Sequence, residues 1–193
     1  VSIMASIVLA GSSSGSVTIA APAAAGSTTL TLPAGSGTIV TTASNETNTP
    51  AFSAQLGSAQ TITNVTVTKA LFNNQLFDTD NAFDTSTNRF TVPTGKAGIY
   101  SISAHLRFTT SASNLNLAVL YLYKNNAIAK YAYNNHNANG RGTADSIALT
   151  TLLDLNAGDY LEIFAYMGGG STGSGLQLNT GTYTTFCAHK LIT

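Results

Sequence analysis

Three carboxylates lie close together in the sequence Asp-Thr-Asp-Asn-Ala-Phe-Asp, at Asp78, Asp80 and Asp84. Hard cations such as Ca²⁺ prefer several oxygen ligands, so this cluster is a candidate calcium site. The spacing departs from the EF-hand loop, because its fifth position is Ala82 and its sixth, normally glycine, is Phe83. The alternative is a turn whose acids are solvated, and the departure favours that alternative.

A second cluster combines aromatic rings, amides and one guanidinium in the segment 131–141. Tyrosine offers a flat amphipathic ring at a small cost in side-chain entropy, and asparagine both donates and accepts hydrogen bonds. An exposed loop of this kind suits the binding of sugars or protein surfaces, and the alternative is a plain solvated loop. The predicted ligand-binding residues are Tyr131, Tyr133, Asn134, Asn135, His136, Asn137, Asn139 and Arg141. The glycine-rich segment 171–174 is a weaker candidate.

Two short patterns resemble catalytic motifs without the context that those motifs need. Residues 168–173 fit G-x-G-x-x-G, and residues 11–15 fit G-x-S-x-G. Both motifs place a helix directly after the glycine-rich turn, and the sequence shows no helical period there. His105 and His189 are predicted to be polar strand residues near a subunit boundary rather than bases or metal ligands. Cys187 is predicted to be a small buried residue of the last strand rather than a catalytic thiol, so we expect no enzymatic activity.

Charge is sparse throughout the chain. Only 8 % of the 193 residues are charged, against roughly a quarter in an average protein, while 44 % are apolar. The polar surface must therefore consist mainly of Thr, Ser, Asn and Gly, which suits sugars, uncharged partners and tight oligomer packing. The eight Lys and Arg residues are scattered and are balanced by eight acids, which excludes the clustered positive charge that nucleic-acid binding needs. No apolar run reaches about 20 residues, so we expect no membrane insertion.

The stretch from Phe83 to Phe108 is predicted to form two strands around one turn, with Pro93 and Gly98 in the turn region. Beyond the turn, apolar residues occupy every second position, at Tyr100, Ile102, Ala104, Leu106 and Phe108. A period of two is typical of a half-buried strand. Similar short alternating stretches give about ten strands and no helix, which predicts an all-β sandwich.

The segment from Leu115 to Tyr123 is apolar at both odd and even positions. A strand that is apolar on both faces is buried on both. Because one face of a strand in a single sandwich is normally wet, we predict that the face with Leu120 and Leu122 contacts another subunit. The Asn-Asn pair at 125–126 predicts a hairpin turn, since asparagine tolerates positive φ.

Residues 1–45 contain neither a charged nor an aromatic residue. Short strand candidates lie at 16–20, 28–33 and 37–41, separated by Gly, Pro and Ala. So few large apolar side chains cannot offset the ordering of this backbone, and we predict that three chains pool their strands in a trimeric stem. The segment resembles a short β-rich region of bacteriophage tail and fibre proteins. The alternative is a flexible low-complexity linker.

Three segments after residue 50 together resemble the C1q/TNF-like jelly-roll family. The central signature is carried by Phe83, Asp84, Thr87, Phe90, Pro93, Gly98, Tyr100, Ile102 and His105. A hairpin at 153–161 and a closing strand at 185–192 follow in the family's order, although the closing strand has Phe-Cys-Ala-His where many members have Phe-x-Gly-Phe. The resemblance implies a β-sandwich head at 46–193 that forms a homotrimer and binds a partner. Some members of the family bind calcium, so the resemblance keeps calcium as a candidate cofactor of this chain.

These expectations combine into a non-enzymatic virion protein, with a β-rich stem at 1–45 and a C1q-like head at 46–193. We expect it at the virion surface as the tip of a phage fibre, joined to the rest of the fibre. Its partner would be a host-surface glycan or protein. Two alternatives stay open: a structural cap, decoration or trimerisation module, and a secreted C1q-like binding protein. A collagen-type Gly-x-y repeat would favour the secreted protein. The chain begins at Val1, and we expect it to be part of a longer product.

Overall fold

The computed structural model describes residues 6–10, 12–20, 29, 48–111, 115–136, 142–169 and 175–191. The chain divides into two compact units, Val1–Asn45 and Glu46–Thr193. In the first unit, β1 (Ser6–Ala10) and β2 (Ser16–Ala20) form an antiparallel hairpin. Strand β2 confirms the candidate at 16–20. The candidates at 28–33 and 37–41 lie, apart from Thr29, outside the described residues.

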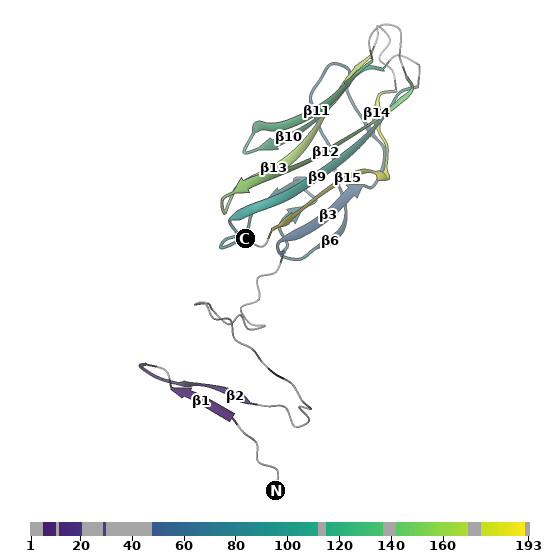
Figure 1. Ribbon diagram of the computed structural model, residues 1–193. Helices are drawn as coiled ribbons and strands as arrows, with labels where there is room; N and C mark the ends of the chain where they lie inside the picture. Colours follow the sequence, from purple (N-terminus) through teal and green to yellow (C-terminus); the bar gives the residue numbers. More distant parts are fainter. Residues whose placement is uncertain are drawn as a thin grey trace. The chain divides into compact units, whose positions relative to one another are not determined.

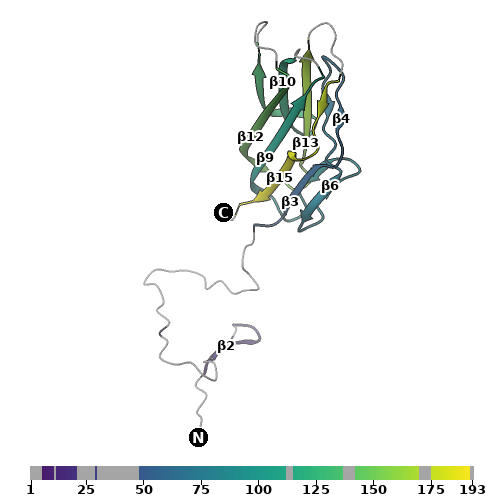
Figure 2. The same ribbon diagram turned by 90° about the vertical axis from the view of Figure 1, so that its right-hand side faces the viewer.

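The second unit is an all-β sandwich of two antiparallel sheets (Figures 1 and 2). The sheet that we call the β10 sheet has the order β11, β10, β13, β8 and β7, with β5 paired to β13. Its strands are β5 (Thr68–Lys69), β7 (Phe83–Asp84), β8 (Arg89–Thr91), β10 (Leu115–Lys124), β11 (Ala127–Asn135) and β13 (Tyr160–Gly169).

The other sheet, the β9 sheet, has the order β4, β14, β9, β15, β3 and β6, with β12 also paired to β9. Its strands are β3 (Ala51–Leu56), β4 (Gln60–Thr61), β6 (Asn74–Asp78), β9 (Gly98–Thr109), β12 (Ala144–Leu155), β14 (Gln177–Leu178) and β15 (Gly181–Lys190). Four of the thirteen strands in the sandwich have only two residues. The expected all-β sandwich of about ten strands is therefore confirmed.

Phenylalanine rings join the two sheets across the core. The Phe52 ring stacks on Phe83 and Phe90, with centroids 4.7 and 4.9 Å away, and meets Phe186 edge-on at 4.9 Å. Phe52 and Phe186 belong to the β9 sheet, whereas Phe83 and Phe90 belong to the β10 sheet. The five alternating apolar residues of β9 are all buried, as the period of two predicts. One of them, Tyr100, donates its hydroxyl to the Lys96 carbonyl at 2.6 Å.

The two ends of the sandwich differ in what they carry. At one end the domain's first and last strands meet, where the Lys190 amide donates to the Pro50 carbonyl at 3.0 Å. The β10–β11 hairpin turn is also there, and Asn125 and Asn126 adopt φ of 51° and 67°, which confirms the predicted turn. The end of β11 and the start of β12 lie at the opposite end of the domain (Figure 1). The predicted binding loop thus leaves the sandwich far from the point where the chain enters it.

One prediction about the strands is wrong. Leu120 and Leu122 do not face outward toward another subunit, because both are fully buried in the chain's own core. An irregularity between Leu115 and Leu117 breaks the simple alternation, so Leu115 also points inward. Val65 lies in a turn, where it has a φ of 57°.

Candidate functional site

The predicted binding loop begins on β11, the edge strand of the β10 sheet. Tyr131 and Tyr133 point outward there and are 60 % and 58 % exposed. At the end of the strand, the Asn134 side-chain amide donates to one Asp145 oxygen at 2.9 Å. His136 Nε2 lies 2.8 Å from the other Asp145 oxygen. Because Asp145 is in β12 of the β9 sheet, its carboxylate ties the end of β11 to the opposite sheet.

Not all of the predicted loop residues are part of this arrangement. Asn135 ends β11, opposite Leu117 of β10, while Asn137, Asn139 and Arg141 lie outside the described residues. The residue that sequence analysis missed is Asp145. In the sequence, the only feature that could have pointed to Asp145 is its position near the start of the strand that follows a polar loop.

A larger aromatic surface continues from β11 across the β10 sheet. Tyr131 of β11 and Phe164 of β13 each lie opposite Tyr121 of the central strand β10. The centroids of Tyr121 and Tyr131 are 6.1 Å apart, and those of Tyr123 and Phe164 are 4.4 Å apart. We call this surface the tyrosine face, and it consists of Tyr121, Tyr123, Tyr131, Tyr133, Phe164 and Tyr166. Sequence analysis predicted only its two residues on β11.

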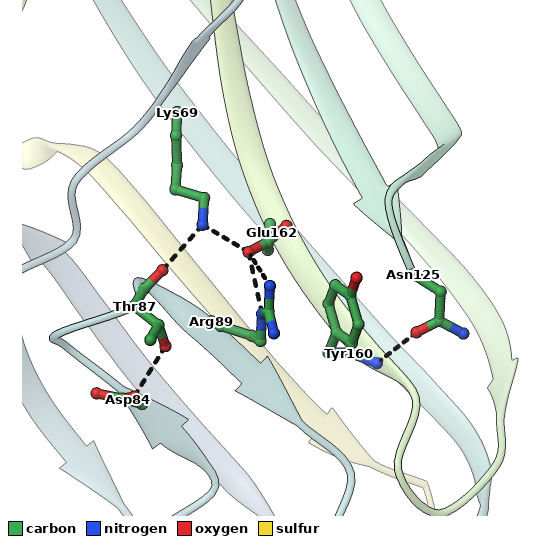
Figure 3. Close-up of polar contacts among 7 residues, drawn as sticks. All are labelled: Lys69, Asp84, Thr87, Arg89, Asn125, Tyr160 and Glu162. Atoms are coloured by element: carbon green, nitrogen blue, oxygen red, sulfur yellow. Dashed lines mark hydrogen bonds and ion pairs between the residues drawn. The ribbon is translucent and has the colours of Figure 1, made fainter.

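An ion network borders the tyrosine face on β13. Glu162 is only 2 % exposed, and one of its oxygens lies 2.5 Å from Lys69 Nζ and 3.0 Å from Arg89 (Figure 3). Lys69 Nζ also donates to the Thr87 carbonyl at 3.0 Å. The Arg89 guanidinium lies 3.8 Å from the centroid of the Tyr160 ring, which is a cation–π contact. The network therefore holds β5 and β8 against β13 and leaves one net positive charge at this border.

The three candidate calcium ligands are engaged in local turns. Asp78 accepts from the Phe83 amide at 2.7 Å and from the Asp80 amide at 3.3 Å. Asp84 accepts hydrogen bonds from Ser86 at 2.7 and 2.8 Å, and these bonds lower the pKa of Asp84 to about 2. Among the described residues, no three His, Cys, Asp or Glu side chains converge as a metal site. Calcium therefore stays a prediction, and the contacts seen here are those of stabilised turns.

The other candidate groups lie on the outward side of the β9 sheet. His105 and His189 are on β9 and β15, and Cys187 lies opposite Ser103. Cys187 is only partly buried, so its prediction as a core residue is wrong. Burial nevertheless raises the pKa of this thiol, which disfavours the thiolate that a nucleophile needs. An open hollow of about 400 Å³ passes beside Cys187, His189 and Phe77.

Comparison with known proteins identifies the sandwich. The C1q domain model matches residues 51–189. This chain belongs to the C1q family. The fold is also similar to the globular domain of zebrafish complement 1qA protein, with a TM-score of 0.54 and 17 % sequence identity over 74 % of this chain and 98 % of that one. No curated protein matches the sequence.

The C1q domain contains every described part of the candidate site, from β5 to β13. It also includes the departure in the closing strand, where Phe186 and Ala188 face the core and Cys187 and His189 face outward. C1q domains are binding and structural modules. The described ranges contain no helix with the length and apolar character needed to span a bilayer.

Proposed function

We propose that this protein is a trimeric, non-enzymatic adhesin at the tip of a phage fibre, which binds a glycan or protein on the host surface. The observation that carries the proposal is the C1q domain itself, because such domains typically form trimers and bind ligands. The viral setting is supported by the sequence of residues 1–45, which resembles the β-rich segments of phage fibre proteins.

The candidate binding residues are well placed for attachment. Tyr131, Tyr133, Asn134 and His136 lie at or near the end of β11, at the opposite end of the sandwich from Pro50. A fibre that enters the domain at Pro50 would therefore present them outward. Three copies of a weak site on one rigid head raise the overall affinity through effective concentration, without any strong single contact.

The hairpin β1–β2 favours the association of several chains. Ile7, Val8, Leu9 and Ile19 are all more than two-fifths exposed in the single chain. An isolated two-stranded hairpin is marginally stable in water, so these side chains need a partner surface. The same observation favours a second candidate function, in which the protein only caps or trimerises a structural fibre.

Sedimentation equilibrium and cell binding together test the proposal. We expect a stable mass of three chains over a wide concentration range, and labelled protein should bind cells of at least one strain in a bacterial panel. The changes Tyr133→Ala and His136→Ala should weaken that binding while the trimer persists. A persistent monomer would refute the trimeric adhesin. A trimer whose binding ignores both changes would favour the purely structural function.

A further inference from the structure

The side chains of the tyrosine face lie on the outer side of the β10 sheet, away from the core. Register pairs place three rows of side chains across β11, β10 and β13: Tyr133, Val119 and Tyr166, then Tyr131, Tyr121 and Phe164, then Ile128, Tyr123 and Glu162. Val119 is nearly covered by its neighbours, whereas Tyr131, Tyr133 and Ile128 are each more than half exposed. The sheet thus presents a row of rings, of which the two on β11 are the most exposed.

The hydroxyls of these rings are available to a ligand. The buried Tyr100 donates its hydroxyl to a carbonyl, as a buried phenol normally does. In the described part of the chain, no hydroxyl of the tyrosine face makes such a bond. The rings also lie near one another, because the centroid of Tyr121 is 6.2 Å from that of Tyr123 and 6.1 Å from that of Tyr131. The face therefore combines apolar rings with hydroxyl donors and acceptors.

The charged groups next to the face lie at its borders, where each carboxylate is engaged by neighbouring side chains. At one border Lys69 and Arg89 both contact Glu162, and Lys69 Nζ lies 5.8 Å from the centroid of Phe164. At the other border Asp145 is engaged by the side chains that end β11. Among the described residues, the rings between these borders carry no formal charge, so the surface is complementary to an uncharged ligand.

We infer that the tyrosine face binds an uncharged saccharide chain that lies across β11, β10 and β13. One side of a sugar ring consists of C–H groups and packs on an aromatic ring, while its edge carries hydroxyls that donate and accept hydrogen bonds. The phenol hydroxyls offer the matching groups. This inference rests on the proposed function, because it assigns a ligand class to the same binding protein.

Other ligands match this surface less well. An anionic glycan would meet only one net positive charge in this network, at the border where Glu162 contacts both Lys69 and Arg89, and none on the rings themselves. A protein partner would gain most from an anchor in a central pocket, and the hollow beside Cys187 belongs to the other sheet. A flat face of stacked rings instead favours a weak contact that is repeated along a polymer and across several copies.

An array of immobilised oligosaccharides tests the inference directly. The array carries neutral glucans, galactans, mannans and N-acetylglucosamine polymers, beside anionic heparin and alginate. We expect the full chain to bind at least one neutral polymer and neither anionic one. Tyr131→Ala should weaken this binding about tenfold, as expected for the loss of one stacking ring, whereas Tyr131→Phe should retain most of it. The matched control is Tyr183→Ala on β15, which removes a similarly exposed ring from the other sheet and should have no effect.

The possible results separate this inference from the proposed function. Binding to anionic glycans alone, or to no neutral polymer, would overturn the saccharide assignment even where the protein still binds cells. Equal losses from the Tyr131 and Tyr183 changes would show that the tyrosine face is not the site. Failure of the wild-type chain to bind any cell strain or to form an oligomer would instead overturn the proposed function. Sedimentation of Tyr131→Ala shows whether the change acts through assembly, and a loss of the wild-type mass would refute a direct contact with sugar.

Discussion

Glu162 offers the sharpest test of how the β10 sheet is held together. The change Glu162→Gln keeps the volume of the side chain but removes its charge from a site that is 2 % exposed. Each hydrogen bond to a charged group contributes roughly 1.5–3 kcal/mol, and Glu162 accepts from both Lys69 and Arg89. These two cations are 29 % and 34 % exposed, so water partly replaces the lost partner.

The expected cost is the sum of these effects. The uncharged glutamine oxygen can still accept hydrogen bonds from the two cations, and rehydration of those cations recovers part of the loss. We therefore expect Glu162→Gln to lower the free energy of unfolding by about 2 kcal/mol. In a domain of this size, that loss lowers the melting temperature by roughly 4–8 °C.

Thermal unfolding followed by circular dichroism measures this shift. All variants must be compared at the same chain concentration, because association makes the melting temperature concentration-dependent. The matched control is Asp154→Asn, which removes a carboxylate from β12 that makes no ion pair with any described residue; it should shift the melting temperature by less than about 1 °C. Equal shifts for the two variants would refute the reasoning that the network stabilises the sheet.

Other predictions concern single sites. Hydrogen bonds from Lys124 and its neighbours lower the pKa of Asp159 to about 2. The stability that this carboxylate contributes is therefore fully present above its unfolded pKa near 4 and is lost as the pH falls through 2. In Asp159→Asn, the free energy of unfolding should depend less on pH between 4 and 2. Gly175→Ala should destabilise more than Gly95→Ala in urea unfolding, because both have positive φ but only the first would place a Cβ 2.5 Å from a serine oxygen. Cys187 should react slowly with iodoacetamide at pH 7 and faster as pH rises, because burial raises its pKa; reaction at the rate of a free thiol would contradict this. Leu120→Ala should cost about 2–5 kcal/mol in the same urea assay, and a cost under 1 kcal/mol would contradict its place in the core.

The sequence predicts the core strand β9 because its apolar residues occupy every second position along the whole strand. Tyr100 to Phe108 alternate without interruption, and every predicted inward residue is buried. The same reasoning fails in β10, where the irregularity between Leu115 and Leu117 puts two apolar residues of one predicted face on opposite sides. A local insertion in a ladder leaves no mark in the composition of the strand, so the error could not be avoided from the sequence alone.

Contacts across the two sheets were also beyond the sequence. Asp145 meets Asn134 and His136 only because β11 and β12 are edge elements of different sheets that lie side by side. Glu162 meets Lys69 and Arg89 over separations of 93 and 73 residues. A single sequence shows the types of these residues but not which strands pair, so neither cluster could be predicted.

The position of the tyrosines follows from the same physical constraint that makes the fold. In β10, the inward side chains Leu120 and Leu122 fill the core, which leaves Tyr121 and Tyr123 on the outer side. A β-bulge between Leu122 and Tyr123 shifts the pairing with β11, so that Ile128 lies beside Tyr123 and extends the aromatic surface. A contiguous apolar patch on the exposed face of a sheet lowers solubility, and such a patch commonly marks a binding site. Strand β10 therefore supplies the core with Leu120 and Leu122 and places Tyr121 and Tyr123 on the face that we propose to bind saccharide.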